Sequence, residues 1–107
     1  TMKFIVYTKS NCRYCEMAKA DISDFLYKYA YQQKDKTLLE VINITDTGFT
    51  VEDLKEKFSN LGLPAPRSVP CIFYKEEAKS DIEDYIGGYS ELKTFLDSLK
   101  GKFDANN

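Results

Sequence analysis

Cys12 and Cys15, two cysteines separated by two residues, are the side chains whose type and spacing point most directly to chemistry. A thiolate attacks a disulfide, and a second thiol one helical turn away can attack the mixed disulfide that forms. Lys9 and Arg13 are near neighbours of Cys12 in the sequence, and cations beside a thiol favour its nucleophilic thiolate form. Cys15 is placed to resolve the mixed disulfide. The pair is therefore interpreted as a redox dithiol.

The dithiol lies where an apolar strand is expected to pass into a helix. Residues 4–7 are β-branched or aromatic, which is typical of a buried strand. After the cysteines, apolar residues recur at helical spacing, at Ala18, Ile22, Phe25 and Tyr29. The first N–H groups of a helix have no internal partner, and the helix dipole leaves partial positive charge there. A thiolate at this helix start is expected to be stabilised.

Length and cysteine content indicate one intracellular domain. A chain of 107 residues can bury a core without disulfide or metal staples, and we expect a single domain over residues 1–107. Three cysteines, two of them in C-x-x-C, fit a catalytic dithiol in a reducing cytosol better than a secreted disulfide framework. The sequence therefore predicts a cytoplasmic protein.

Charge and composition exclude several other classes of function. The net charge is −2 and no basic patch is visible, so nucleic acid is not an expected ligand. No apolar run approaches the length of a membrane span, so no membrane association is expected. The sequence has no histidine, which removes Cys-His catalysis and every zinc site that needs imidazole. A zinc site made by all three cysteines lacks an evident fourth ligand, and no metal is predicted.

The order of elements predicts an α/β fold. Strands are expected at residues 3–8, 38–44 and 69–74, with a fourth strand ending at 84–86. The first helix is expected over about 13–32, followed by a polar connection at 33–36. A second helix is expected over about 51–61, with Thr50 and Asp53 as a capping box and Gly62 at its end. A last helix is expected to be capped by Ser90 and closed by Gly101. Strand–helix–strand implies that the first two strands are parallel.

Three separated motifs resemble those of the glutaredoxins, a family of the thioredoxin-fold superfamily, and the match covers nearly the whole chain. Lys9 with Cys12-Arg13-Tyr14-Cys15 resembles the family's lysine and C-P-Y-C active site. Residues 68–73 resemble T-V-P-x-I-F, and residues 86–91 resemble I-G-G-Y-[ST]-D. The tyrosine inside C-x-Y-C favours glutaredoxin over thioredoxin, whose C-G-P-C follows a tryptophan, and this chain has no tryptophan.

The resemblance implies a thioredoxin-like fold with a four-stranded mixed sheet, in the order βαβ-α-ββ-α, flanked by helices. It also implies thiol-disulfide oxidoreduction with glutathione as co-substrate and no tightly bound cofactor. Cys12 would be the nucleophile and Cys15 the resolving thiol. The glutathione-binding residues that it implies are Lys9, Tyr14, Arg67, Val69, Pro70, Gly88, Tyr89, Ser90 and Glu91.

Each implied glutathione-binding residue has a physical role. Pro70 would form a cis peptide facing the dithiol and leave the Val69 backbone open to pair with the cysteinyl peptide group. Free N–H groups near Ser90 and Glu91 would hold the γ-glutamyl carboxylate, and glycine at position 88 would let the main chain pass close to the ligand. Lys9 or Arg67 would neutralise the glycyl carboxylate, and Tyr14 would form one wall of the groove.

The chain departs from the family pattern at three places. Arg13 replaces the proline of C-P-Y-C, which removes a rigid residue and adds a charge. Glu91 replaces aspartate, so its carboxyl group lies one methylene further out. The hairpin over residues 75–84 is longer than in compact bacterial members, and it is acidic and expected to be exposed. Non-proline dipeptides with tyrosine also occur in the glutaredoxin-like thioredoxins of large bacteriophages.

Three functions follow from these observations. The first is a monomeric glutaredoxin that reduces protein disulfides and glutathione mixed disulfides. The second is a thioredoxin-like hydrogen donor for ribonucleotide reductase or another disulfide-containing protein, recharged by a flavoprotein reductase. The third is an iron-sulfur carrier in which Cys12 and glutathione from two protomers hold a cluster. Cys71, in an apolar strand, is expected to be a small buried side chain without a redox role.

Overall fold

The fold is a mixed four-stranded sheet with helices on both faces, and the computed structural model describes residues 1–30, 38–46 and 48–105. In chain order the elements are β1 (Lys3–Thr8), α1 (Arg13–Ala30), β2 (Leu39–Asn43), α2 (Val51–Asn60), β3 (Cys71–Lys75), β4 (Asp84–Gly87) and α3 (Tyr89–Ala105). The strand order is β2-β1-β3-β4. β1 pairs parallel with β2, and β3 is antiparallel to β1 and β4. The predicted α/β class and thioredoxin-like order are confirmed.

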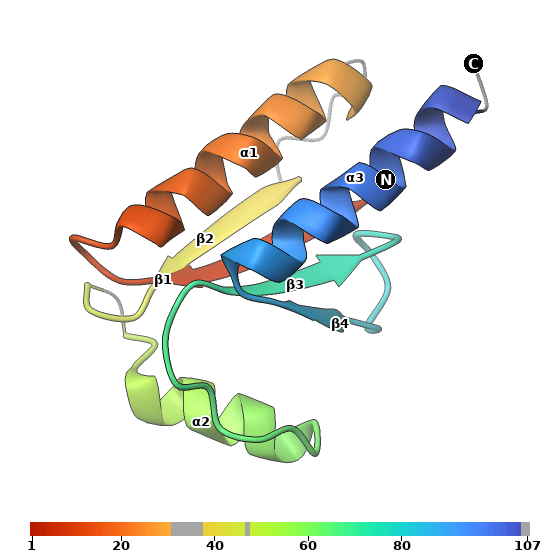
Figure 1. Cartoon of the computed structure of the whole chain (residues 1–107). Helices are drawn as coiled ribbons and strands as arrows, with labels where there is room; N and C mark the ends of the chain where they lie inside the picture. The colour runs from red at the N-terminus through yellow and green to blue at the C-terminus, as the bar shows by residue number, and fades with distance from the viewer. Residues whose placement is uncertain (31–37, 47, 106–107) are drawn as a thin grey trace.

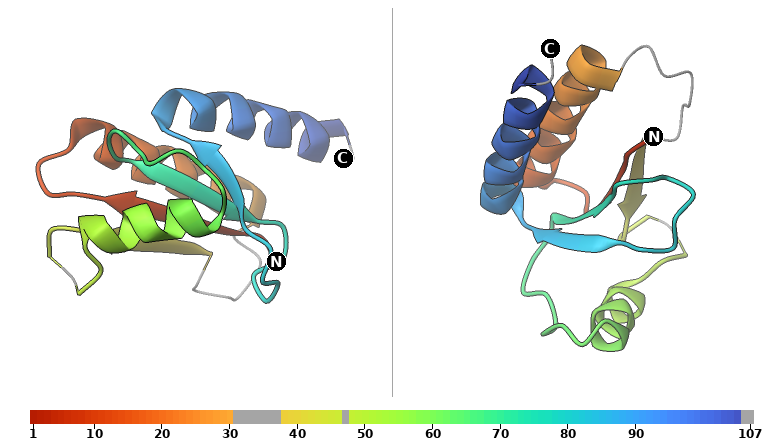
Figure 2. Two further views of the ribbon diagram at one scale, coloured as in Figure 1. Left: turned by 90° about the horizontal axis from the view of Figure 1, so that it is seen from below. Right: turned by 90° about the vertical axis from the view of Figure 1, so that its right-hand side faces the viewer.

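The sheet separates two apolar layers. Helices α1 and α3 lie side by side on one face, and α2 covers the other (Figures 1 and 2). Side chains of β1 alternate between the layers, because successive residues of a strand point to opposite faces. Phe4 and Val6 pack under α1 and α3, whereas Ile5 and Tyr7 pack against α2. The first strand is therefore buried on both faces, as its continuous apolar sequence predicts.

Helix α2 begins with the capping box that the sequence predicts. The Asp53 N–H donates to the Thr50 hydroxyl at 3.2 Å, and the Thr50 N–H donates to the Asp53 carboxylate at 2.7 Å. Gly62, at φ +72°, follows the helix and lies in the left-handed region that favours glycine. On the buried face, Phe58 is 1% exposed and packs edge-on against Phe73 of the sheet. This side chain fixes α2 to the sheet.

Both predicted ends of the last helix were wrong. α3 begins at Tyr89, so Ser90 is inside the first turn and is not its cap. Gly101 does not close α3, which continues to Ala105. The reason is packing: Phe103 stacks on Tyr29 of α1, with ring centroids 5.4 Å apart. Packing of this partly buried ring opposes the cost of about 1 kcal/mol that glycine carries inside a helix.

Smaller differences concern strand ends. β3 begins at Cys71 rather than at residue 69, since Pro70 has no N–H to donate to a ladder. β4 extends to Gly87, beyond the predicted residue 86. The expected last turn of the first helix and the connection at 33–36 lie outside the described residues.

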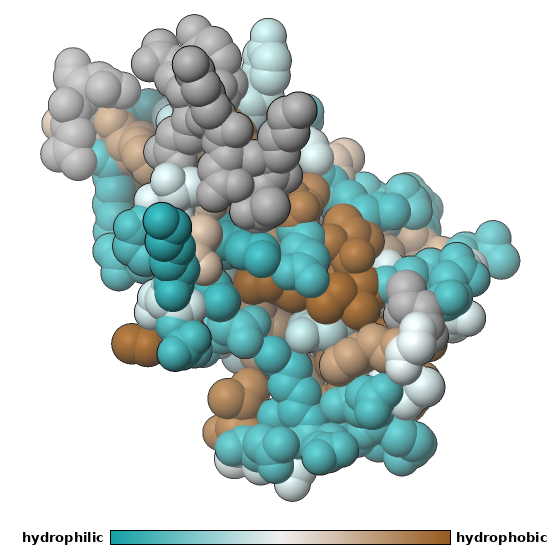
Figure 3. Space-filling model, turned by 180° about the vertical axis from the view of Figure 1, so that it is seen from behind, coloured by the Kyte–Doolittle hydropathy of each residue, from teal (hydrophilic) through white to brown (hydrophobic). Residues whose placement is uncertain are grey.

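The surface is largely hydrophilic in the view from behind, with apolar side chains gathered near the centre of that face (Figure 3). No helix in the described ranges has the length and apolar character needed to cross a bilayer.

Candidate active site

The dithiol is built into the first turn of α1. The helix begins at Arg13, so Cys12 is at the N-cap position and Cys15 is its third residue. The two cysteines form a disulfide, with Cα atoms 5.2 Å apart. The Cys15 N–H lies 3.2 Å from Cys12 Sγ, and the Glu16 N–H donates to the Cys12 carbonyl at 3.1 Å. An N-cap side chain normally accepts the N–H of the third residue, and here the acceptor is sulfur.

A short loop brings Cys12 to this position. Asn11 has φ +57°, a left-handed conformation that asparagine tolerates better than most residues, and it turns the chain from β1 into α1. The Ser10 N–H donates to the Thr45 hydroxyl at 3.3 Å, and the Asn43 amide donates to the Ser10 hydroxyl at 3.3 Å. The loop before the dithiol is thus held by the chain that follows β2. No pattern in the sequence predicted these contacts.

The two sulfurs differ in accessibility. Cys12 is 9% exposed, whereas Cys15 is completely buried. Cys12 is thus the more exposed of the two cysteines. The roles of attacking thiol for Cys12 and resolving thiol for Cys15 stay predictions.

The loop before β3 lies against the attacking sulfur. Cys12 Sγ is 3.9 Å from the carbonyl oxygen of Val69. The Val69–Pro70 peptide bond is cis, as the resemblance implied, and Pro70 is buried. The backbone of Val69 is therefore placed where a peptide attached to Cys12 would pass.

A pocket of about 150 Å³ begins at Val69 and includes two of the predicted cations, Lys9 and Arg67. Its other lining residues are Ile44, Val51, Leu54, Lys55, Pro66 and Ser68. Lys9 and Arg67 come from segments far apart in the sequence, and the fold brings them together beside the dithiol. Lys55, on α2, was not selected from the sequence because one lysine in a charged helix face carries no distinctive signal.

At the start of α3, the carboxylate of Glu91 accepts hydrogen bonds from neighbouring residues. The Gly88 N–H donates to Glu91 Oε1 at 2.8 Å, and the Ser90 hydroxyl lies 2.5 Å from Glu91 Oε2. Hydrogen bonds from Ser90 and Gly88 lower the pKa of Glu91 from its ordinary value of 4.5. Free N–H groups were expected here from the sequence. The N–H of Gly88 is instead occupied by Glu91.

The predicted binding residues therefore form two groups. Ser90 and Glu91 line a separate open pocket of about 560 Å³, together with Tyr85, Ile86, Thr94, Phe95 and Ser98. Gly88, just before α3, still lies close to the cis-proline loop, because a Cβ on Gly88 would be 3.7 Å from the Pro70 carbonyl oxygen. The cis-proline loop thus stands between the cationic pocket and the start of α3.

Tyr14 and Tyr89 form an aromatic pair beside the dithiol. Tyr14 is 59% exposed, and its ring centroid is 5.9 Å from that of Tyr89. The Tyr89 hydroxyl donates to Asp21 of α1 at 2.7 Å, and this hydrogen bond raises the pKa of Tyr89. Asp21 thereby positions Tyr89 under Tyr14. Nothing in the sequence distinguishes Asp21 from the other acidic residues on the wet face of α1.

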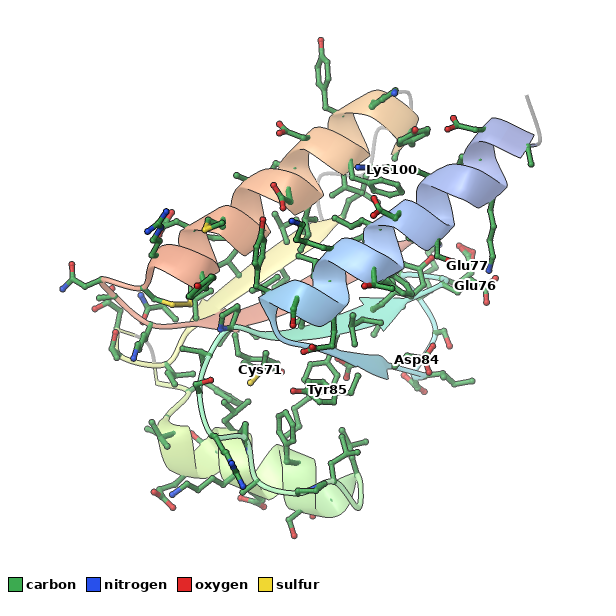
Figure 4. The ribbon with its side chains drawn as sticks, in the orientation of Figure 1. Cys71, Glu76, Glu77, Asp84, Tyr85 and Lys100 are labelled. Atoms are coloured by element: carbon green, nitrogen blue, oxygen red, sulfur yellow. A yellow bond between two sulfur atoms is a disulfide. The ribbon has the colours of Figure 1, made fainter. Side chains whose placement is uncertain are left out.

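The third cysteine is separate from the dithiol. Cys71 is fully buried, and its Sγ lies 3.3 Å from the Ser68 carbonyl. It lies next to Tyr85 in the layer between the sheet and α2 (Figure 4). Burial raises the pKa of the Cys71 thiol to about 11. Within the described part of the chain, no group of three cysteine or acidic side chains is arranged to hold a metal ion.

Solved structures similar to this one include glutaredoxins. Glutaredoxin 1 from Francisella tularensis, determined with cacodylate, is 23% identical, with 94% of this chain and 99% of that chain covered and a TM-score of 0.60. Reduced Escherichia coli glutaredoxin is 26% identical, with 90% and 94% covered and a TM-score of 0.58. The oxidised form of the same E. coli protein gives 26% identity, 88% and 92% coverage and a TM-score of 0.58. No protein-family model and no curated protein sequence matches the chain.

A thioredoxin fold whose first helix begins at a disulfide-forming C-x-x-C pair, with the more exposed of the two cysteines at its N-cap, defines a thiol-disulfide oxidoreductase. Within that class the solved structures similar to this chain include glutaredoxins, and the resemblance recognised in its three motifs is confirmed.

Proposed function

We propose that the chain is a glutaredoxin in function, a glutathione-dependent enzyme that reduces protein disulfides and glutathione mixed disulfides through Cys12 and Cys15. One observation carries the proposal. The sulfur of Cys12, the more exposed cysteine of the pair, lies at the N-cap of α1, 3.9 Å from the Val69 carbonyl, where a pocket lined by Lys9 and Arg67 begins. A thiol nucleophile, an open backbone edge and cations for a carboxylate are what glutathione chemistry requires.

The proposed reaction with a glutathione mixed disulfide takes two exchange steps. The Cys12 thiolate attacks the glutathione sulfur, a new disulfide forms between Cys12 and glutathione, and the substrate leaves as a thiolate that takes up a proton. A second glutathione, as thiolate, then attacks the glutathione sulfur bound to Cys12. Oxidised glutathione is released and the Cys12 thiolate is regenerated, so two glutathione-derived electrons reduce one disulfide.

A protein disulfide follows a different second step. Cys12 forms a mixed disulfide with the substrate, and the buried Cys15 thiolate attacks Cys12 to release the reduced product. The Cys12–Cys15 disulfide that remains is then reduced by two molecules of glutathione. Cys15 is required on this route, whereas glutathione mixed disulfides need only Cys12.

The remaining predicted residues would place glutathione on Cys12. The Val69 backbone would pair with its cysteinyl peptide group beside Pro70, and Lys9 or Arg67 would bind its glycyl carboxylate. Tyr14, packed on Tyr89, would lie beside the cysteinyl residue of glutathione. The start of α3, at Gly88 and Ser90, would receive the γ-glutamyl carboxylate once Glu91 is displaced from the Gly88 N–H. We expect the protein to be a cytoplasmic monomer that needs no tightly bound cofactor.

The test is glutathione-dependent reduction of a small mixed disulfide by the wild type, Cys15→Ser and Cys12→Ser. Turnover by the wild type and by Cys15→Ser, with none by Cys12→Ser, is the expected result. Activity that survives Cys12→Ser would refute the assignment of the nucleophile. Absence of glutathione turnover by every form, in a protein whose disulfide still cycles with dithiothreitol, would refute glutathione dependence.

One observation favours a second candidate, a thioredoxin-like reductant of a partner such as ribonucleotide reductase. Glu91 already occupies the Gly88 N–H, and this internal carboxylate repels a ligand carboxylate at the start of α3. A protein recharged by a flavoprotein reductase does not need that site. Rapid turnover with NADPH and a thioredoxin reductase, in the absence of turnover with glutathione, would select this candidate.

A further inference from the structure

The pocket beside Cys12 has a sign of charge opposite to that of the chain as a whole. Lys9, Lys55 and Arg67 line it, and its lining includes no acidic residue. The chain carries a net charge of −2. For comparison, the groove between α1 and α3 is lined by three lysines, Lys28, Lys93 and Lys100, and by three aspartates, Asp21, Asp24 and Asp97. The pocket beside the dithiol is thus a local concentration of positive charge.

The three cations are available to a ligand. Over the described residues, neither Lys9 nor Arg67 makes an ion pair, and both are exposed. Lys55 is 3.7 Å from Glu52, a neighbour on α2 whose side chain is 82% exposed. An exposed pair of this kind contributes little stability, so Lys55 can exchange Glu52 for an incoming carboxylate.

The pocket also has a partly apolar lining and one end at the reacting sulfur. Val51, Leu54 and Val69 contribute apolar surface. Val69 is the residue whose carbonyl lies 3.9 Å from Cys12 Sγ. A substrate peptide that is attached to Cys12 and runs along Val69 therefore enters this pocket. Its apolar side chains can contact the apolar lining, and its carboxylates can pair with the cations.

We propose that this pocket binds an acidic segment of the protein substrate, adjacent to the cysteine that Cys12 attacks, and that Lys55 selects for it. The inference rests on the proposed function and specifies its substrate class. Glutathione brings one carboxylate to this end of the site, for which Lys9 or Arg67 is sufficient. A third cation matches a ligand with more than one negative charge nearby, and charge complementarity of this kind raises association rates.

The test measures the first exchange step alone, with no recycling reductant. Fully reduced protein is mixed with a synthetic peptide whose single cysteine carries a neutral 2-thiopyridyl group. Cys12 attacks the peptide sulfur, 2-thiopyridone leaves and is followed by absorbance, and Cys15 then releases the peptide thiol. One peptide has glutamate at several positions beside the cysteine, and its partner has glutamine at the same positions. The measured quantity is the ratio of the two second-order rate constants.

We expect the wild type to react about threefold to tenfold faster with the glutamate peptide at low ionic strength, and the ratio to fall towards one in high salt. Lys55→Glu should lower the ratio below that of the wild type. Lys79→Glu changes net charge equally at an exposed site in the β3–β4 connection, outside the pocket, and should keep most of the preference.

A ratio near one in the wild type, or equal losses in Lys55→Glu and Lys79→Glu, would overturn the inference. Both outcomes are independent of glutathione, because the step is a single turnover of the reduced protein. Failure of the proposed function appears separately, as lack of recycling by glutathione in the mixed-disulfide assay.

Discussion

The side chain of Glu91 folds over Gly87 so closely that a Cβ at position 87 would lie 2.8 Å from Glu91 Cβ. Gly87 also has φ +129°, which side-chain-bearing residues rarely adopt. We predict that Gly87→Ala lowers the free energy of unfolding by about 1–3 kcal/mol, measured by urea denaturation. Gly88→Ala is the control, since its added Cβ would meet Glu91 at 3.5 Å, an ordinary contact. Equal stabilities of the two variants would contradict this account.

Acid should weaken the caps of two helices. Hydrogen bonds from Thr50 lower the pKa of Asp53 from 3.8, and those from Ser90 and Gly88 lower the pKa of Glu91 from 4.5. A carboxylate whose pKa is lower in the folded state contributes stability that is fully present above its ordinary pKa. That stability is lost as the pH falls through the folded-state pKa. We therefore predict a falling urea midpoint below about pH 4.5.

The contribution of Glu91 to this acid sensitivity can be isolated by substitution. Glu91→Gln should flatten the fall in midpoint with decreasing pH, because glutamine cannot be protonated in this range. Glu56→Gln is a matched control at an exposed position of α2, with no ion pair or hydrogen bond to the described residues. A pH dependence identical in Glu91→Gln, Glu56→Gln and wild type would show that Glu91 does not act as described.

Only one of the three cysteines should react readily with an alkylating agent in the reduced, folded protein. Cys12 is 9% exposed and its sulfur lies next to the Cys15 N–H at the helix start, whereas Cys71 is completely buried with a pKa of about 11. We predict that iodoacetamide at neutral pH modifies Cys12 more than tenfold faster than Cys71, as read from peptide masses. Unfolding in urea should abolish the difference. Comparable labelling of Cys71 in the native state would contradict its burial.

The attachment of α2 depends on one aromatic side chain. Phe58 is 1% exposed and packs edge-on against Phe73 and Tyr85, with centroid distances of 5.7 and 4.9 Å. We predict that Phe58→Ala lowers the free energy of unfolding by about 3–5 kcal/mol, because a cavity opens between α2 and the sheet. Ser59→Ala, at an exposed neighbouring position, should have little effect. If Phe58→Ala lowers the free energy of unfolding by less than about 1 kcal/mol, neighbouring side chains must fill the space that the ring leaves.

Local patterns in the sequence predicted the parts of the fold that depend on interactions between residues close in the chain. The apolar run in β1, the helical spacing in α1 and the Thr50–Asp53 capping box each depend on neighbouring residues, and each prediction is confirmed. The end of α3 depends instead on a distant contact. Phe103 packs on α1, and that packing keeps Gly101 helical. No local pattern in the sequence predicts this contact.

The same distinction between local patterns and distant contacts applies to the candidate site. Family motifs identified the cysteines and the cis-proline loop, because these residues are defined by type and spacing. The occupied Gly88 N–H is a local contact with Glu91, three residues further on, and it was not predicted because Glu91 was assigned to ligand binding. The third cation at Lys55 was not predicted, since it joins Lys9 and Arg67 only when separate segments meet. Asp21 under Tyr89 is a further case, because an aspartate on a helix surface gives no sign of what it will contact.

Cys12 at the N-cap of α1 and Cys15 in its first turn have their Cα atoms 5.2 Å apart. This separation is within the range that a disulfide spans, and it is also the ordinary spacing of residues three apart in a helix. Gain or loss of two electrons therefore requires side-chain rotation but no unwinding of the backbone. The oxidised and reduced proteins then present nearly the same backbone shape to a partner protein. A partner that distinguishes the two forms must therefore contact the sulfur atoms.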